Sequence, residues 1–232
     1  MATTTDRQLL DLMTWLSPSF PVGGYAYSHG IEYAVENARI SNEHDLAGWI
    51  NAALIQGAGR LDGIFFVATW QAITEQDNDR FGWVIERQDV MRGTSELALE
   101  GSAQGQAFLD TIAQTRNFLR LEDLLALIRS SERRVTYAVA VAIVAALAEV
   151  PLRAALLAYY HAFAANLISA GVRLVPLGQI AGQRMQEKLK PVIEQATEAA
   201  LCGDIEYIGT AAPLIDWASM KHETQYTRLF RS

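Results

Sequence analysis

The sequence predicts an all-α, single-domain helical bundle of about ten helices, and three observations predict it. Apolar residues recur at i, i+3, i+4 and i+7 in most segments, as on one face of a helix. Alanine-rich runs stand where strands would need alternating β-branched residues. No linker rich in Gly, Ser or Pro divides residues 1–232, so one core is expected.

The first expected helix has an apolar face and a start signal. Thr5 and Gln8 have the spacing of a capping box, and Pro18 and Pro21 end the helix. Its apolar face consists of Leu9, Leu12, Met13 and Leu16. A helix over 28–39 follows, for which Ser28 is the expected cap. The next helix begins at Asn42 as N-cap, and its apolar face consists of Leu46, Trp49, Ile50, Ala53 and Leu54.

The middle and C-terminal parts of the chain continue the helical pattern. Asp62-Gly63 precedes a helix-compatible run and predicts no hairpin. Pro191 should kink or split the last long helix, and Gly203 is its stop signal. The further helices are expected over 97–112, 121–128, 137–149, 151–170 and about 178–202.

Composition excludes several classes of protein. Lys and Arg number 19 and Asp and Glu 26, a net charge of −7, which argues against binding to a nucleic-acid backbone. The single cysteine, Cys202, forms no internal disulfide and no multi-cysteine metal site. The polar start, 1–8, lacks a signal-peptide core, and the apolar run 135–148 is too short to span a membrane. A soluble cytoplasmic protein with no membrane partner is expected.

Catalytic motifs are incomplete. No Gly-Lys pair is present for a P-loop. The segment around Ser28 approaches the GxSxG pattern, but Ala26 replaces the first glycine. A helical serine hydrolase using Ser28 with His29 or His161 is the alternative hypothesis. His222-Glu223 lacks the second histidine of HExxH, and no cofactor or resident metal is expected.

Charged residues at 86–92 predict an ordinary solvated face. Glu86 or Asp89 would form exposed ion pairs with Arg92 on one helix turn. Three other segments are unusual. The loop 17–30 combines prolines and glycines with aromatic residues, and 172–184 breaks a helix between two arginines. The end, 220–232, is locally basic and carries Leu229-Phe230, so it docks on the domain or on a partner.

Four segments in order resemble the urease accessory protein UreF family: 17–32 (SPSFPVGGYAYSHGIE), 86–101 (ERQDVMRGTSELALEG), 166–185 (NLISAGVRLVPLGQIAGQRM) and 218–232 (ASMKHETQYTRLFRS). The resemblance implies an all-helical homodimer without chemistry of its own. It implies an adaptor that bridges a UreD/UreH-like accessory protein and the UreG GTPase. The complex would deliver nickel to apo-urease, and nickel would be cargo of the complex. The adaptor would also regulate or time GTP hydrolysis.

The resemblance also suggests partner-binding residues. Tyr25 matches a family pattern, and we expect it near the C-terminal tail (about 219–232), with Arg228 as its partner. The central motif is expected near the dimer and GTPase-facing surfaces, where Arg173 or Arg184 could act as an arginine finger, although plain scaffolding is favoured. The expected set is Tyr25, Tyr27, Ser28, Glu32, Asn166, Arg173, Gln179, Gln183, Arg184, Tyr226, Arg228, Leu229, Phe230 and Arg231.

Overall fold

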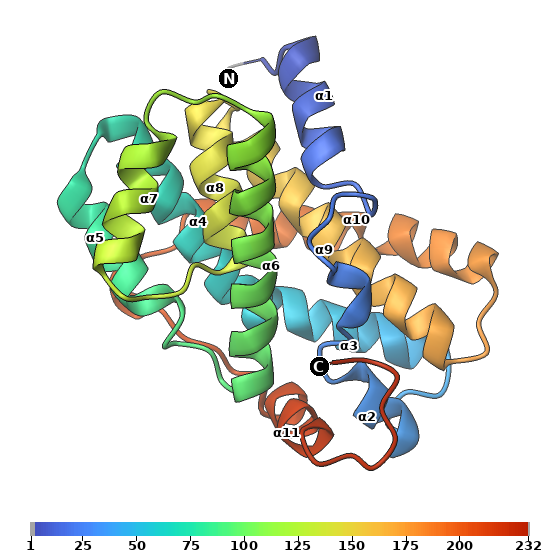
Figure 1. Cartoon of the computed structure of the whole chain (residues 1–232). Coiled ribbons are helices and arrows are strands. Elements are labelled where there is room, and N and C mark those ends of the chain that lie inside the picture. The colour runs from blue at the N-terminus through green and yellow to red at the C-terminus, as the bar shows by residue number, and fades with distance from the viewer. Residues whose placement is uncertain (1–2, 232) are drawn as a thin grey trace.

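The computed structural model describes residues 3–231, and in this range it contains eleven α-helices, two short 3-10 helices and no strand. The predicted all-α fold is therefore confirmed (Figure 1). The α-helices are α1 (Asp6–Trp15), α2 (Ile31–Glu36), α3 (Glu43–Ile55), α4 (Ala58–Glu75), α5 (Asn78–Gln88), α6 (Ser95–Thr115), α7 (Leu121–Ser130), α8 (Tyr137–Leu147), α9 (Leu152–Leu174), α10 (Gln179–Leu201) and α11 (Pro213–His222). The 3-10 helices are η1 (Gly24–Ala26) and η2 (Ile205–Tyr207).

Helix α8 is the centre of the core. Every residue from Ala138 to Ala146 is buried, and the helix packs against α4, α6 and α9. Its small and β-branched side chains allow close approach on all sides. Gly105 of α6 lies directly against the backbone of Val135, where a Cβ atom would overlap the carbonyl. The apolar run 135–148 is thus a buried core helix, as its length predicts.

Helix α9 passes through the middle of the bundle. It is the one helix among residues 3–231 with the length and composition to cross a membrane, yet half of its most apolar stretch is buried inside the protein. It packs against α10, α8, α2, α3 and α4. The buried face includes Tyr159, Tyr160 and Leu167. These contacts explain the apolar composition of α9 as that of a core helix.

The helix starts are partly as the sequence predicts. The capping box of Thr5 and Gln8 is present at α1, and the Asn42 side chain accepts the N–H groups of residues 44 and 45 at α3. The expected helix over 28–39 is wrong in its bounds, since α2 covers only Ile31–Glu36. His29 and Gly30 have left-handed backbones (φ 57° and 77°) and break the helix before Ile31. Gly30, rather than Ser28, is the N-cap residue.

One further expectation needs correction, and one of two alternatives for the last long helix is excluded. Arg92 forms no exposed pair with Glu86 or Asp89; it is buried and pairs with Asp62 of α4 at 2.5 Å. Glu86 and Asp89 are close to Arg92 in sequence, but the fold places the more distant carboxylate of Asp62 beside the Arg92 guanidinium. Pro191 does not split the last long helix, because α10 runs unbroken from Gln179 to Leu201. Packing of α10 against α9, α3 and α4 stabilises the helix through the proline.

Candidate functional site: the docked C-terminal tail

The C-terminal tail, expected over about 219–232, begins at residue 223, because residues 219–222 belong to α11. From residue 223 to 231 it returns across the body of the protein. In Figure 1 it passes α2 and ends beside the segment that precedes α2. The N–H of Arg231 donates to the carbonyl oxygen of Ala26 in η1, with an N···O distance of 2.7 Å. Phe230 is buried with 4% of its surface exposed. The tail therefore docks on the domain, as one of the two readings of its composition predicts.

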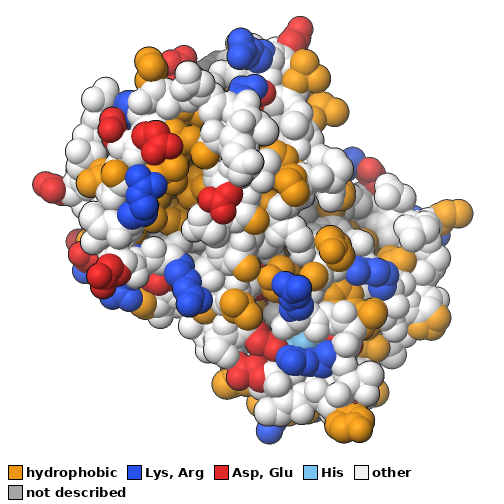
Figure 2. All heavy atoms as spheres, in the orientation of Figure 1, with side chains coloured by type: hydrophobic (Ala, Val, Ile, Leu, Met, Phe, Trp, Pro, Cys, Tyr) orange, Lys and Arg blue, Asp and Glu red, His pale blue; other side chains and the backbone are white. Residues whose placement is uncertain are grey.

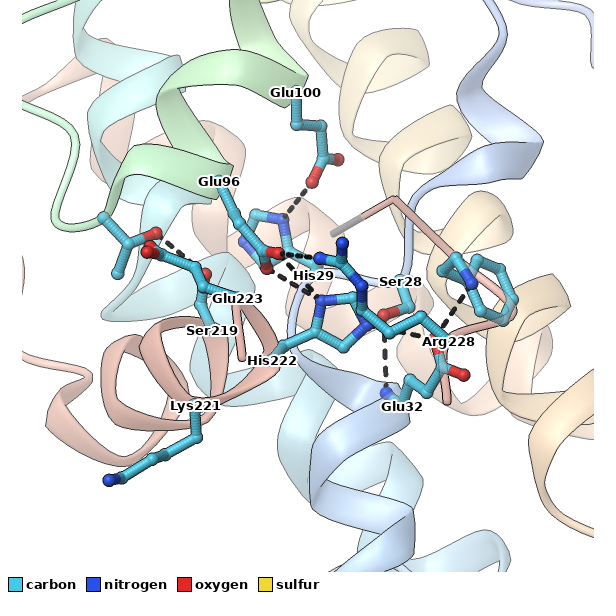
Figure 3. Close-up of polar contacts among 12 residues, drawn as sticks. Ser28, His29, Glu32, Glu96, Glu100, Ser219, Lys221, His222, Glu223 and Arg228 are labelled. Carbon is cyan, nitrogen blue, oxygen red and sulfur yellow. Dashed lines mark hydrogen bonds and ion pairs between the residues drawn. The ribbon is translucent and has the colours of Figure 1, made fainter. Parts of the chain in front are cut away.

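Beneath the tail lies a buried histidine between two carboxylates (Figure 3). The Nδ1 atom of His222 lies 2.9 Å from Oε2 of Glu96, and its Nε2 atom lies 3.0 Å from Oε2 of Glu32. The His222 side chain is 0% exposed. Glu32 comes from α2, Glu96 from α6 and His222 from the end of α11, so the cluster joins three helices.

Both carboxylates also hold the tail. Glu32 accepts the N–H groups of Leu229 and Phe230 through its two oxygens, at 2.6 and 2.9 Å. The Arg228 guanidinium donates to Oε1 of Glu96 at 3.2 Å. Burial raises the pKa of the Glu96 carboxyl, and its hydrogen bond to His222 opposes that rise. Arg228 is thus paired with Glu96, and its expected contact with Tyr25 stays a prediction.

The C-terminal half of α9 supports the same surface. The Arg173 guanidinium carbon lies 4.3 Å above the centre of the Phe230 ring, a cation–π contact. Partial burial lowers the pKa of Arg173. About two turns earlier in α9, the Asn166 side-chain amide donates to the carbonyl oxygen of Gly24 at 3.0 Å. The loop, the tail and α9 therefore form one continuous surface.

The outer side of this surface is aromatic, aliphatic and basic. Tyr25, Tyr226 and Leu229 are 72%, 103% and 67% exposed. Arg228 and Arg231 are exposed next to them. Figure 2 shows basic side chains over this lower part of the molecule, beside a few acidic ones. Exposed aromatic and arginine side chains are enriched in protein interfaces. The other expected residues of this region are buried beneath the surface and support it: Tyr27, Ser28, Glu32 and Phe230.

The remaining members of the expected set lie at the start of α10. Gln179, Gln183 and Arg184 are exposed. Arg184 pairs with Glu43 of α3 at 3.1 Å, and Lys188 pairs with the same carboxylate at 2.8 Å. These two bonds lower the pKa of Glu43. This group is a second exposed region, anchored to α3 rather than to the tail.

A cavity of about 300 Å³ lies under the loop before η1 and borders α6 and α9. The His29 ring at its wall contacts Phe163 edge-on at 5.5 Å, and its Nδ1 atom lies 3.4 Å from Oε2 of Glu100. Ser28 is 0% exposed, and its hydroxyl oxygen accepts the N–H of Glu32 at 3.4 Å. A nucleophile must reach its substrate, so the geometry of Ser28 gives the hydrolase alternative no support.

His222 and Glu96 are not in the set of site residues expected from the sequence. His222 is followed by Glu223 but completes no zinc motif, and Glu96 lies in the 86–101 segment without a motif of its own. The indication that the sequence does contain is their position, because Glu32, Glu96 and His222 lie in three of the four segments that resemble the family. Within residues 3–231, no group of three or more His, Cys, Asp or Glu side chains is placed to hold a metal ion.

The sequence was compared with known protein families. The UreF family model matches residues 40–190. A protein named urease accessory protein UreF from Granulibacter bethesdensis is 42% identical over 231 residues, covering 100% of this chain and 97% of the relative. Proteins of the same name from Rhodopseudomonas palustris (strain BisA53) and Bradyrhizobium sp. (strain BTAi1) are each 42% identical over 224 residues, covering 97% of this chain and 93% and 92% of the relatives.

The names of these relatives indicate an accessory role to urease. The match extends over nearly the full length of both chains, so it includes the tail and all three helices that hold it. The chain belongs to the UreF family of urease accessory proteins.

Proposed function

We propose that this protein is a cytoplasmic adaptor in urease maturation. It bridges a UreD/UreH-like accessory protein and the UreG GTPase, and the assembled complex inserts nickel into apo-urease. The observation that carries this proposal is the docked tail, because its residues form one exposed aromatic and basic surface with η1 and α9. The names of the relatives supply the link to urease.

The tail surface is the contact for the UreD/UreH-like protein. Tyr25, Tyr226 and Leu229 together offer exposed apolar area, and burial of such area stabilises complexes by roughly 25 cal/mol per Å² before the costs of association. Arg228 and Arg231 add donors for carboxylates on the partner. A surface assembled from three segments of the chain is sensitive to the position of the tail.

The start of α10 is the contact for the GTPase and for a second copy of this chain. Gln179 and Gln183 present amide donors and acceptors to solvent. Arg184 and Lys188 share Glu43, which leaves part of their positive charge available to an acidic partner. The two proposed contacts are on different elements, as an adaptor that holds two partners at once requires.

Co-expression with a UreD/UreH-like protein and UreG, followed by gel filtration, tests the bridge. We expect one complex that contains all three proteins. Deletion of residues 226–232 should remove the UreD/UreH-like protein from the complex and leave the helical content unchanged. Failure of the intact chain to co-elute with either partner would refute the adaptor role.

A matched pair of tyrosines sharpens this experiment. Tyr25 and Tyr207 are 72% and 76% exposed, and only Tyr25 lies on the tail surface. Tyr25→Ala should weaken binding of the UreD/UreH-like protein at least about tenfold, a typical loss for an interface aromatic residue. Tyr207→Ala should bind like the unmodified protein. Equal effects of the two substitutions would place the contact elsewhere.

The proposed influence on GTP hydrolysis is scaffolding rather than an inserted arginine. Arg173 lies on Phe230, and Arg184 is paired with Glu43, so an arginine finger would first have to leave these contacts. Single-turnover GTP hydrolysis by UreG, with saturating adaptor, distinguishes the two. We expect Arg184→Ala to weaken binding of UreG and Arg173→Ala to weaken binding of the UreD/UreH-like protein, and neither substitution to change the hydrolysis rate of the bound complex. A loss of about 10³-fold or more in that rate would identify an arginine finger.

A further inference from the structure

The cavity under η1 contains a buried polar side chain that the bundle does not satisfy. The cavity has a volume of about 300 Å³, at the lower end of the range for small-molecule sites. His29 lines it and is buried, and neither of its ring nitrogens has a hydrogen-bond partner. Because buried polar groups in proteins are nearly always hydrogen-bonded, His29 points to a ligand that carries hydrogen-bonding groups.

Glu100 of α6 supplies a carboxylate on the same wall. Its Oε2 atom lies 3.4 Å from Nδ1 of His29, and its Oε1 atom accepts the Gln104 side-chain amide at 3.4 Å. Both distances are longer than is usual for an N–H···O bond. Figure 3 shows the Glu100 carboxylate directed at the His29 ring. Since a carboxylate has about four acceptor positions, Glu100 can accept shorter, charge-assisted bonds from a donor in the cavity.

Carboxylates outnumber guanidinium groups in the lining of the cavity. Arg92 pairs with Asp62 at 2.5 Å, and the other Asp62 oxygen accepts the Tyr159 hydroxyl at 2.7 Å. Nε of Arg92 has no hydrogen-bond partner, but Asp62 already balances its charge. Glu100 adds a second negative charge to the lining. The cavity therefore favours a cation over an anion.

The rest of the wall is apolar and largely aromatic. The rings of Phe20, Tyr137 and Phe163 line it, together with Leu97 and Ala138. Aromatic rings attract ammonium and guanidinium groups and also pack against an apolar body. An excess carboxylate combined with aromatic walls fits an organic cation.

We propose that this cavity binds a small organic cation, an ammonium or guanidinium group on an alkyl or aryl body. The N–H groups of the cation donate to Glu100 and to a ring nitrogen of His29, and the body lies against the aromatic wall. Two of the lining residues, Tyr25 and His161, are exposed, so the cavity opens to solvent on their side. A free amine and the lysine or arginine side chain of a bound protein carry the same group and can enter there.

Titration of the intact chain with benzylammonium tests the site. Benzyl alcohol and phenylacetate are the matched probes, because they share the benzyl group and differ in charge. We expect benzylammonium to bind with a Kd of about 1 mM or tighter, and the other two probes to bind at least about tenfold more weakly. Equal affinity for the three probes, a preference for phenylacetate, or no binding would refute the proposal.

Amide shifts in nuclear magnetic resonance locate the bound probe. Gly24 and Gly101 line the cavity, so their amide shifts should move with the titration. Gly48 and Gly209 lie outside the lining and should not move. Shifts spread evenly over the four glycines would indicate surface binding of the cation and contradict the proposal.

A competition experiment distinguishes the two sources of the cation, and this experiment alone rests on the proposed function. The affinity for the UreD/UreH-like protein is measured with and without saturating benzylammonium. A loss of affinity assigns the cation to a side chain of that partner, and an unchanged affinity assigns it to a free amine. The titration of the isolated chain succeeds or fails independently of the partner.

Two substitutions with matched controls test the residues. Glu100→Gln keeps the size of the side chain and should weaken benzylammonium binding at least about tenfold, whereas Glu122→Gln changes an exposed carboxylate on α7 and should have no effect. Ala165→Leu places a larger side chain in the lining and should abolish binding. Ala158→Leu is its control, because Ala158 is a half-buried alanine of the same helix outside the lining. If Glu100→Gln fails to fold, Ala165→Leu decides alone: unchanged binding contradicts the site.

Discussion

Removal of the Phe230 ring is the most direct perturbation of the docked tail. Phe230 is 4% exposed and lies under the Arg173 guanidinium. Burial of such a side chain is worth about 1.5 to 3 kcal/mol, and an exposed cation–π contact adds about 0.5 to 1 kcal/mol. Phe230→Ala should therefore weaken docking by about 2 to 4 kcal/mol, which is about 30- to 700-fold in the docking constant.

Hydrogen exchange of the intact variant measures this loss. Peptides from residues 224–231 should exchange faster by that factor, while peptides from α8 should keep the protection of the original protein. Leu229→Ala is the matched control in the same tail, because Leu229 is 67% exposed and leaves the backbone bond to Glu32 in place. Equal exchange in the two variants would refute the role of Phe230 as the anchor.

Three further predictions concern the body of the protein. Gly30→Ala should lower Tm by about 2 to 8 °C, since φ is 77° and the new Cβ would lie 3.1 Å from the Ser219 nitrogen. Arg92→Met should cost about 3 to 5 kcal/mol in urea denaturation, because it leaves the buried Asp62 carboxylate without its cation. The Glu43 contacts should be lost as pH falls below 4.5 and through the lowered pKa of this carboxyl, a window that carboxyl NMR titration measures.

Each of these predictions has a control. Gly82→Ala introduces a Cβ with no atom within 4 Å in a helix, so its Tm should not fall. Arg87→Met removes an exposed pair with Glu86 and should cost less than about 1 kcal/mol. Lys188→Ala should return the pKa of Glu43 toward 4.5. A fall in Tm for Gly82→Ala as large as that for Gly30→Ala would contradict the backbone argument.

Local features were predictable from sequence because the interactions that produce them are local. The capping box at Thr5 and the cap at Asn42 involve residues at most three positions away, and the buried run of α8 is evident from its composition. Conformation was harder where the backbone is unusual. Ser28 suits a cap by residue type, but the left-handed turn at His29 and Gly30 moves the start of α2 to Ile31.

Tertiary partners were not predictable in this way. His222 lies 190 positions from Glu32 and 126 from Glu96, and neither separation has a helical or strand period. Arg92 has acidic neighbours in sequence, yet its partner is Asp62 on α4. The four family segments indicated which stretches of chain matter. They did not indicate that three of these stretches supply one charged cluster.

The backbone hydrogen bonds to Glu32 and the side-chain contacts of the tail have different roles. An extended segment directs successive side chains to opposite sides, and here Phe230 is buried while Leu229 is exposed. Since Glu32 binds backbone N–H groups, it recognises the path of the tail and not its side chains. Phe230 and Arg228 therefore fix which segment docks, while the exposed side chain of Leu229 remains free to contact a partner.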